Sequence, residues 1–193
     1  METLTAVFDF LCGQERCFVV DGAALPVCQR CTGLYVGALL AGFWLFASRT
    51  RQRGVPPARL AWAYAAVLIA ALLGGVHVLD FGPRWRFLCG LWTGQVVLVW
   101  LFTGTTQLST WACGSSGESL FWTRRDKLGA CAMLALAPIL ALASPMPHGT
   151  WSVWTAAIVG GALLLGITGL RTVSAAIRAV TASTCSTQPE KCE

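Results

Sequence analysis

Charged side chains are scarce in this sequence, and that scarcity narrows the class of protein. Of the 193 residues, 12% are Asp, Glu, Lys or Arg and 55% are hydrophobic. A soluble domain usually carries about a quarter charged residues. So few charges cannot cover a water-facing surface, which argues against a soluble protein.

The sequence also lacks the motifs of several enzyme classes. It has no glycine-rich phosphate-binding loop, no paired carboxylates within its apolar stretches and no Ser-His-Asp set, which argues against nucleotide-dependent enzymes and hydrolases. The net charge of +5 comes from short basic runs between apolar segments, so membrane topology explains it better than nucleic acid does. We expect no nucleic-acid partner.

Long apolar stretches are what the sequence has instead. Crossing a bilayer as a helix takes about 20 apolar residues, and five stretches without Asp, Glu, Lys or Arg approach or reach that length: residues 32–48, 60–79, 87–107, 128–146 and 150–170. No alternating pattern of the outer-membrane barrel type is present. We therefore expect an all-α bundle of about five transmembrane helices, a multi-pass protein of the cytoplasmic membrane in contact with lipid.

The basic residues predict the orientation of this bundle. Ten of the 14 Lys and Arg residues fall on the side that holds the C-terminus, and the positive-inside rule places that side in the cytoplasm. We predict an extracytoplasmic N-terminus. The expected organisation is a cysteine-rich extracytoplasmic or interfacial segment at 1–31, a five-helix transmembrane domain at 32–182 and a flexible cytoplasmic tail at 183–193.

A cluster of cysteines in the N-terminal segment is the strongest candidate for chemistry. Cys28 and Cys31 form a CxxC motif that leads into a helix, whose N-terminus stabilises a thiolate. Cys12 and Cys17 form a second pair upstream. Four thiolates at these spacings are suited to zinc or iron, to disulfide exchange outside the membrane, or to stapling the segment to the membrane surface.

The second extracytoplasmic loop supplies further candidates near the same end. His77 and Asp80 are three residues apart, so they share a helical face, and a carboxylate commonly orients a ligating imidazole. Cys89 follows at the start of the third helix. These three are supporting or alternative ligands. Three arginines are candidates for contacts with anions or lipid phosphate: Arg30, Arg84 and Arg86.

Two glycine patterns predict how the first and third helices meet. Gly33 and Gly37 on one helix, and Gly90 and Gly94 on the other, are small-xxx-small patterns, which let helix backbones approach closely in membranes. If the helices pack at these positions, Cys31 and Cys89 lie at one junction.

Residues 12–18 (CGQERCF) and 26–37 (PVCQRCTGLYVG) resemble a family of small prokaryotic multi-pass membrane proteins of unknown function. The family signature resembles C-H-Q-x-x-x-R-S-F followed by P-x-C-x-R-C-x-G-I-Y-x-G. The chain departs from it at Gly13, where the family has His, and at Cys17, where it has Ser. If the His binds metal, the resemblance implies that Cys17 replaces it; if the His is a catalytic base, the activity is lost here.

These observations leave three functions open, and they do not decide whether the protein is an enzyme. The preferred interpretation is a metal–thiolate site of zinc or iron at Cys12, Cys17, Cys28 and Cys31. The first alternative is a quinone-coupled thiol–disulfide oxidoreductase, with the same cysteines as redox residues. The second is a scaffold with a disulfide-stapled N-terminal segment. The first two imply a metal-delivery or redox partner.

Overall fold

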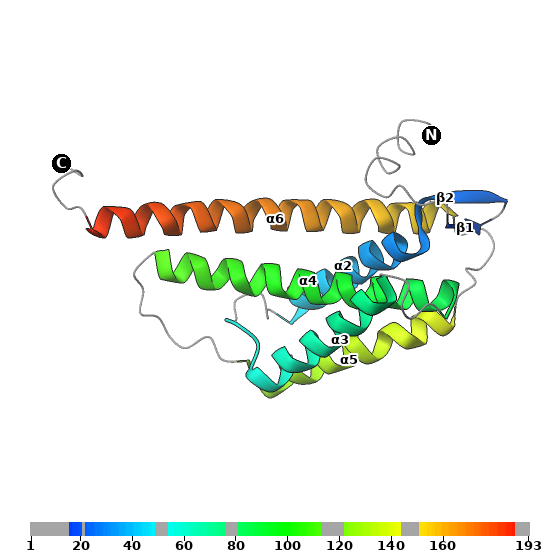
Figure 1. The fold of residues 1–193 in the computed structure, drawn as a ribbon, viewed down its shortest axis with the longest axis horizontal. Coiled ribbons are helices and arrows are strands. Elements are labelled where there is room, and N and C mark those ends of the chain that lie inside the picture. The colour runs from blue at the N-terminus through cyan, green and yellow to red at the C-terminus, as the bar shows by residue number, and fades with distance from the viewer. Residues whose placement is uncertain are drawn as a thin grey trace.

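A computed structural model describes residues 16–20, 22–48, 54–75, 81–112, 122–143 and 151–187. These residues form two short strands followed by five helices (Figure 1). In chain order the elements are β1 (Cys17–Val20), β2 (Ala23–Cys28), α2 (Gln29–Ala47), α3 (Ala58–Gly75), α4 (Pro83–Ala112), α5 (Arg124–Leu142) and α6 (Trp151–Thr187).

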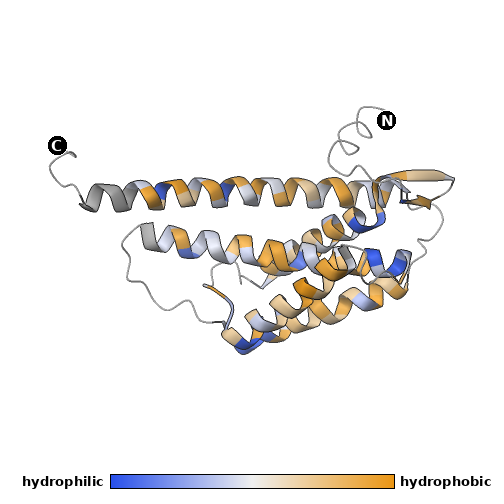
Figure 2. Ribbon diagram, in the orientation of Figure 1, coloured by the Kyte–Doolittle hydropathy of each residue, from blue (hydrophilic) through white to orange (hydrophobic). Residues whose placement is uncertain are grey.

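The described part of the chain confirms an all-α membrane bundle. Four helices are long and apolar enough to cross a membrane, Gln29–Ala47, Pro83–Thr110, Arg124–Ala143 and Trp151–Thr181, and the apolar helix Ala58–Gly74 is shorter. Figure 2 shows hydrophobic residues along the helices, with hydrophilic residues at the starts of α2, α4 and α5 and in the C-terminal half of α6. Large apolar side chains such as Phe43, Trp62 and Leu170 are exposed on the bundle, as a lipid-facing surface requires. The orientation in the membrane stays a prediction.

Helices α2, α4 and α6 run parallel and form the centre of the bundle. Gly90 of α4 lies against Arg30 of α2, and Gly94 lies against Leu34, so both helices advance in the same direction. In the second half of both helices, the hydroxyls of Thr105 on α4 and Thr172 on α6 lie 2.7 Å apart. The remaining two helices, α3 and α5, run the opposite way. Three parallel and two antiparallel helices give the alternation that a five-pass chain needs.

Local signals explain where the helices begin and end. Gly82 has φ +96°, a conformation that favours glycine, and Pro83 follows at the first helical position, where its missing N–H costs nothing. Helix α4 therefore begins four residues before the expected start at 87. Helix α6 continues to Thr187, so residues 183–187, which we assigned to the tail, are helical. Its 37 residues span about 55 Å, well beyond the roughly 30 Å of a bilayer core.

The hairpin of β1 and β2 was not among our expectations. The strands pair antiparallel in the register Val20↔Ala23, Val19↔Ala24 and Cys17↔Cys28, with an irregularity between Cys17 and Val19. The turn holds Gly22 at φ +78°. Residues of both strands pack with Ile158 of α6 in one buried cluster. The segment before the first helix is thus anchored on the bundle as a small sheet.

Candidate functional site

Cys28 lies at the junction between the hairpin and the first helix of the bundle. It ends β2 and is the N-cap residue of α2, where its Sγ accepts a hydrogen bond from the backbone N–H of Cys31 at 3.5 Å. Its side chain is buried, with 3% exposed. Thr32 donates its hydroxyl to the Cys28 carbonyl at 3.0 Å. An amide donor and a helix N-terminus both favour the thiolate form.

Cys17 lies directly opposite Cys28 in the sheet. The N–H of Gln29 donates to the carbonyl of Arg16 at 3.0 Å. In an antiparallel sheet, a hydrogen bond between the neighbours of two facing residues shows that the facing residues are not hydrogen-bonded to each other. Cys17 and Cys28 are therefore a non-hydrogen-bonded pair, and the Cα atoms of such a pair are typically about 4.5 Å apart. Disulfides occur at Cα separations of about 4.4–6.8 Å. Cys17 and Cys28 form no disulfide in this structure, but the register of the hairpin suits one between them.

Cys31 and Cys89 lie at the same end of the bundle. Cys31 is half-buried and packs against the cluster of hairpin and α6 residues, as Tyr35 and Trp154 also do. Cys89 is buried on α4 with 1% exposed. It directly precedes Gly90, whose position against Arg30 brings α4 close to the first turn of α2.

The four glycines of the two small-xxx-small patterns line this junction. A Cβ added at Gly33 would overlap the Phe87 carbonyl oxygen, and one at Gly37 would overlap the Leu91 carbonyl oxygen. From the other helix, a Cβ at Gly90 would lie 2.8 Å from the Leu34 nitrogen, and one at Gly94 would lie 2.8 Å from the Ala38 nitrogen. The backbones of α2 and α4 thus touch at these positions.

Metal ligation finds no support among the described residues. They contain no group of three or more His, Cys, Asp or Glu residues placed to hold a metal ion, although Cys17, Cys28 and Cys31 are all described. The fourth expected ligand, Cys12, and the supporting residues His77 and Asp80 lie outside the described residues.

Two of the three candidate arginines bond within the protein. Arg30 donates from Nη2 to the carbonyl oxygen of Gly74 at 2.8 Å, so its positive charge lies at the C-terminal end of α3, where the helix dipole favours a cation. Arg86 donates from Nη1 to the side-chain oxygen of Gln29 at 3.4 Å. Arg84 instead lines a groove.

This groove lies beside the hairpin and has a volume of about 430 Å³. We call it the hairpin groove, and its lining residues are Cys17, Phe18, Val19, Gln29, Phe81, Pro83 and Arg84. Sequence reasoning missed the parts played by Gln29 and Phe81. For Gln29 a signal existed, since it stands between the two cysteines of the CxxC motif, whereas nothing in the sequence pointed to Phe81.

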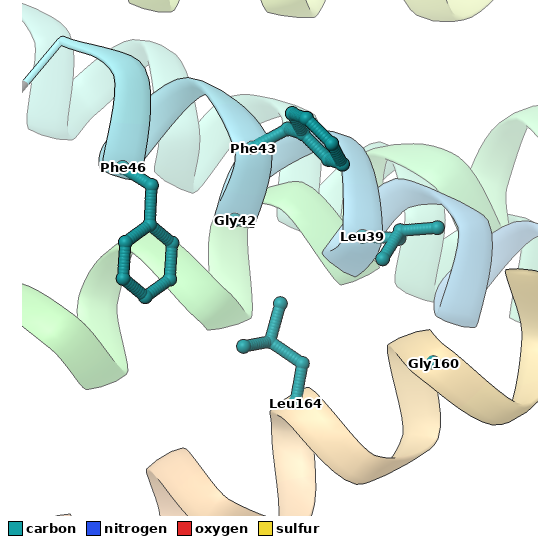
Figure 3. A pocket seen from close by; sticks show the side chains of 6 residues that line it. All are labelled: Leu39, Gly42, Phe43, Phe46, Gly160 and Leu164. Atoms are coloured by element: carbon teal, nitrogen blue, oxygen red, sulfur yellow. The ribbon is translucent and has the colours of Figure 1, made fainter.

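A second, apolar groove lies between α2 and α6 (Figure 3). It has a volume of about 290 Å³ and is lined by Leu39, Gly42, Phe43, Phe46, Gly160 and Leu164. Leu164 points from α6 toward α2 at Gly42. Cys31, Tyr35 and Leu39 follow one another at intervals of four residues, so they share one face of α2. Cys31 therefore lies on the same face of α2 as the groove, about two turns closer to the start of the helix than Leu39.

The fold and the apolar helices define a multi-pass α-helical membrane protein. The chain belongs to the family described as "Predicted membrane protein (DUF2085)", whose model matches residues 12–109, and this confirms a membrane protein family of unknown function. The matched region contains both cysteine pairs, helices α2 and α3, and α4 as far as residue 109. No curated protein and no solved structure matches the chain significantly.

Proposed function

We propose that this protein is a membrane thiol–disulfide oxidoreductase that passes electrons from thiols outside the membrane to a lipid-soluble quinone. One observation carries the proposal: Cys17, Cys28 and Cys31 form a continuous series. Cys17 opens on the hairpin groove, Cys28 stands opposite it in the sheet, and the Cys28 Sγ accepts the N–H of Cys31. The three cysteines thus extend from the open hairpin groove to the α2 face that contacts α6.

The first step oxidises the substrate. A substrate thiolate attacks the Cys17–Cys28 disulfide at Cys17 and releases the Cys28 thiolate, which its N-cap position stabilises. The second substrate thiol then resolves the mixed disulfide. The substrate leaves as a disulfide, and Cys17 and Cys28 hold the two electrons as thiols.

The second step returns the enzyme to its oxidised form. The thiols of Cys28 and Cys31 give two electrons and two protons to the quinone, which leaves as quinol, and a Cys28–Cys31 disulfide forms. The Cys17 thiolate then attacks Cys28 and releases Cys31. The net reaction converts one dithiol and one quinone into one disulfide and one quinol.

The apolar groove supports the choice of a lipid-soluble acceptor. It lies within the membrane-spanning part of α2 and α6, and its lining suits a polyprenyl tail. Cys31 stands two turns above Leu39 on the same face of α2, so a headgroup near Cys31 would leave the tail directed toward the groove. A resident metal at the four predicted ligands remains the competing interpretation.

The test is quinone reduction by a reduced dithiol peptide, measured with the purified full chain in lipid nanodiscs. We expect Cys28→Ser to lower the rate to that of empty nanodiscs, because Cys28 takes part in both steps. Cys131→Ser is the matched control, since Cys131 is exposed on α5, and it should retain the full rate. A Cys28→Ser variant that still reduces quinone at the parent rate sinks the proposal.

A further inference from the structure

We propose that two copies of this chain pair along α6 as a parallel coiled coil. The contact surface is an exposed apolar stripe on the second half of this helix. We call it the α6 stripe, and its residues are Leu163, Gly166, Leu170, Val173 and Ile177. The inference goes beyond the proposed function and does not depend on it, because the cysteines pack near the start of α6.

The stripe has the spacing of a coiled-coil seam. Its residues follow one another at alternate intervals of three and four, and Val180 continues this spacing, so they correspond to the a and d positions of a heptad. The large side chains of Leu170, Val173 and Ile177 are 73%, 58% and 59% exposed. At Gly166 an added Cβ would meet nothing within 4 Å, so a neighbouring helix has room to approach the backbone.

The bundle packs against the opposite face of α6. Gly161, Thr168 and Ala175 are buried and follow one another at intervals of seven residues. They occupy the f position of the heptad when the stripe occupies a and d, and f lies opposite the a/d seam. The described helices of the same chain therefore leave the stripe facing outward.

Lipid can cover only part of the stripe. About 20 residues cross a bilayer core, which takes α6 from Trp151, a residue type of the membrane interface, to about Arg171. The helix continues to Thr187, so Val173 and Ile177 lie beyond the core. Figure 1 shows α6 as one straight helix, so this end does not lie along the membrane surface as an interfacial helix does. A protein partner would remove these side chains from water.

A second copy of the chain fits the stripe. Copies inserted in the same orientation hold their α6 helices parallel and at the same depth, so each stripe meets an identical one across a two-fold axis. The flanking e and g positions, among them Gly169, Ser174 and Ala176, carry no charge, so identical helices do not repel each other there. Arg171 and Arg178 occupy b positions, away from the seam.

Sedimentation equilibrium of the full chain in density-matched detergent measures the pairing. We expect a mass of two chains. Ile177→Glu should raise the dissociation constant about tenfold or more, because it places two unpaired carboxylates in the seam. Arg178→Glu introduces the same side chain one position away, outside the seam, and is the control that should leave the dissociation constant unchanged. Circular dichroism should give equal helix content for all three proteins.

Oxidative crosslinking in the membranes of expressing cells tests the parallel register. Val173→Cys should give a disulfide-linked dimer above the level of the parent chain, because identical d positions face each other in a parallel pair. Arg178→Cys is the control and should stay at the parent level.

Each result bears directly on the inference. Weakening by Ile177→Glu but not by Arg178→Glu, together with the Val173→Cys crosslink, supports it. A parent chain that sediments as a monomer at all concentrations overturns it and assigns the stripe to lipid or to another segment of the same chain. A dimer that is unaffected by Ile177→Glu and gives no Val173→Cys crosslink also overturns it, because the copies then meet elsewhere.

Discussion

Cys17 and Cys28 occupy opposed positions of the β1–β2 hairpin, and Cys28 is at the same time the N-cap of α2. One residue of the pair lines the open hairpin groove and the other is buried at the start of a membrane-spanning helix. This arrangement gives the two cysteines different access to substrate and to the membrane.

Cys31→Ser should separate the two half-reactions. Because Cys17 and Cys28 remain, the variant should oxidise one equivalent of substrate dithiol and then stop, without reducing quinone. The parent protein should turn over repeatedly. Counting substrate disulfides per protein by mass spectrometry checks this, and sustained turnover by Cys31→Ser would exclude Cys31 from the relay.

Gly90→Ala should destabilise the bundle. The added Cβ overlaps the carbonyl oxygen of Arg30, a backbone atom that cannot move alone, and overpacking of this kind costs about 1–3 kcal/mol. Gly169→Ala is the control, because nothing lies within 4 Å of its Cβ position. Chemical unfolding in detergent measures both free energies of unfolding, and equal values would refute the contact between α2 and α4.

Thr123→Ala should weaken the start of α5. The Thr123 hydroxyl accepts the Asp126 N–H, and the Asp126 carboxylate accepts the N–H and hydroxyl of Thr123, each at 2.7 Å. Loss of such a cap costs about 0.5–2 kcal/mol. Thr123→Ser keeps the hydroxyl and should stay close to the parent. The midpoint of thermal unfolding in detergent measures both variants. Equal midpoints for Thr123→Ser and Thr123→Ala would contradict the role of the hydroxyl as a cap.

The charge distribution predicts that the hairpin faces the outside of the cell. An epitope inserted after Gly22 should therefore bind antibody on intact cells, whereas one inserted after Ser48, at the far end of α2, should bind only after permeabilisation. Both positions are exposed, and loop insertions are generally tolerated. The reverse pattern would invert the orientation and place the cysteines in a reducing compartment.

The helices could be predicted because their apolar stretches leave few alternatives. Their ends were harder, since they depend on single residues: Pro83 starts α4 earlier than hydropathy suggested. The helical domain was expected to end at 182, whereas α6 continues to Thr187, because polar residues near the end of α6 are equally typical of a helix and of a tail.

The hairpin could have been anticipated in part. Asp21-Gly22 between two short apolar runs is a hairpin turn signal, but the run after it contains Pro26, which lowers the expectation of a strand. The opposition of Cys17 and Cys28 was beyond prediction, because the irregular pairing between them changes the register. The role of Cys28 as an N-cap was also hidden, since cysteine is not among the preferred N-cap residues.

The most direct test of the account maps the state of the cysteines. The full chain is purified in detergent without reductant or chelator, and disulfides and bound metal are determined by mass spectrometry on one sample. The account predicts a Cys17–Cys28 disulfide in a protein without bound metal. A reduced dithiol peptide should reduce this disulfide, and quinone should re-form it. About one zinc or iron per chain, lost in both Cys28→Ser and Cys31→Ser, would contradict it and establish the metal–thiolate site instead.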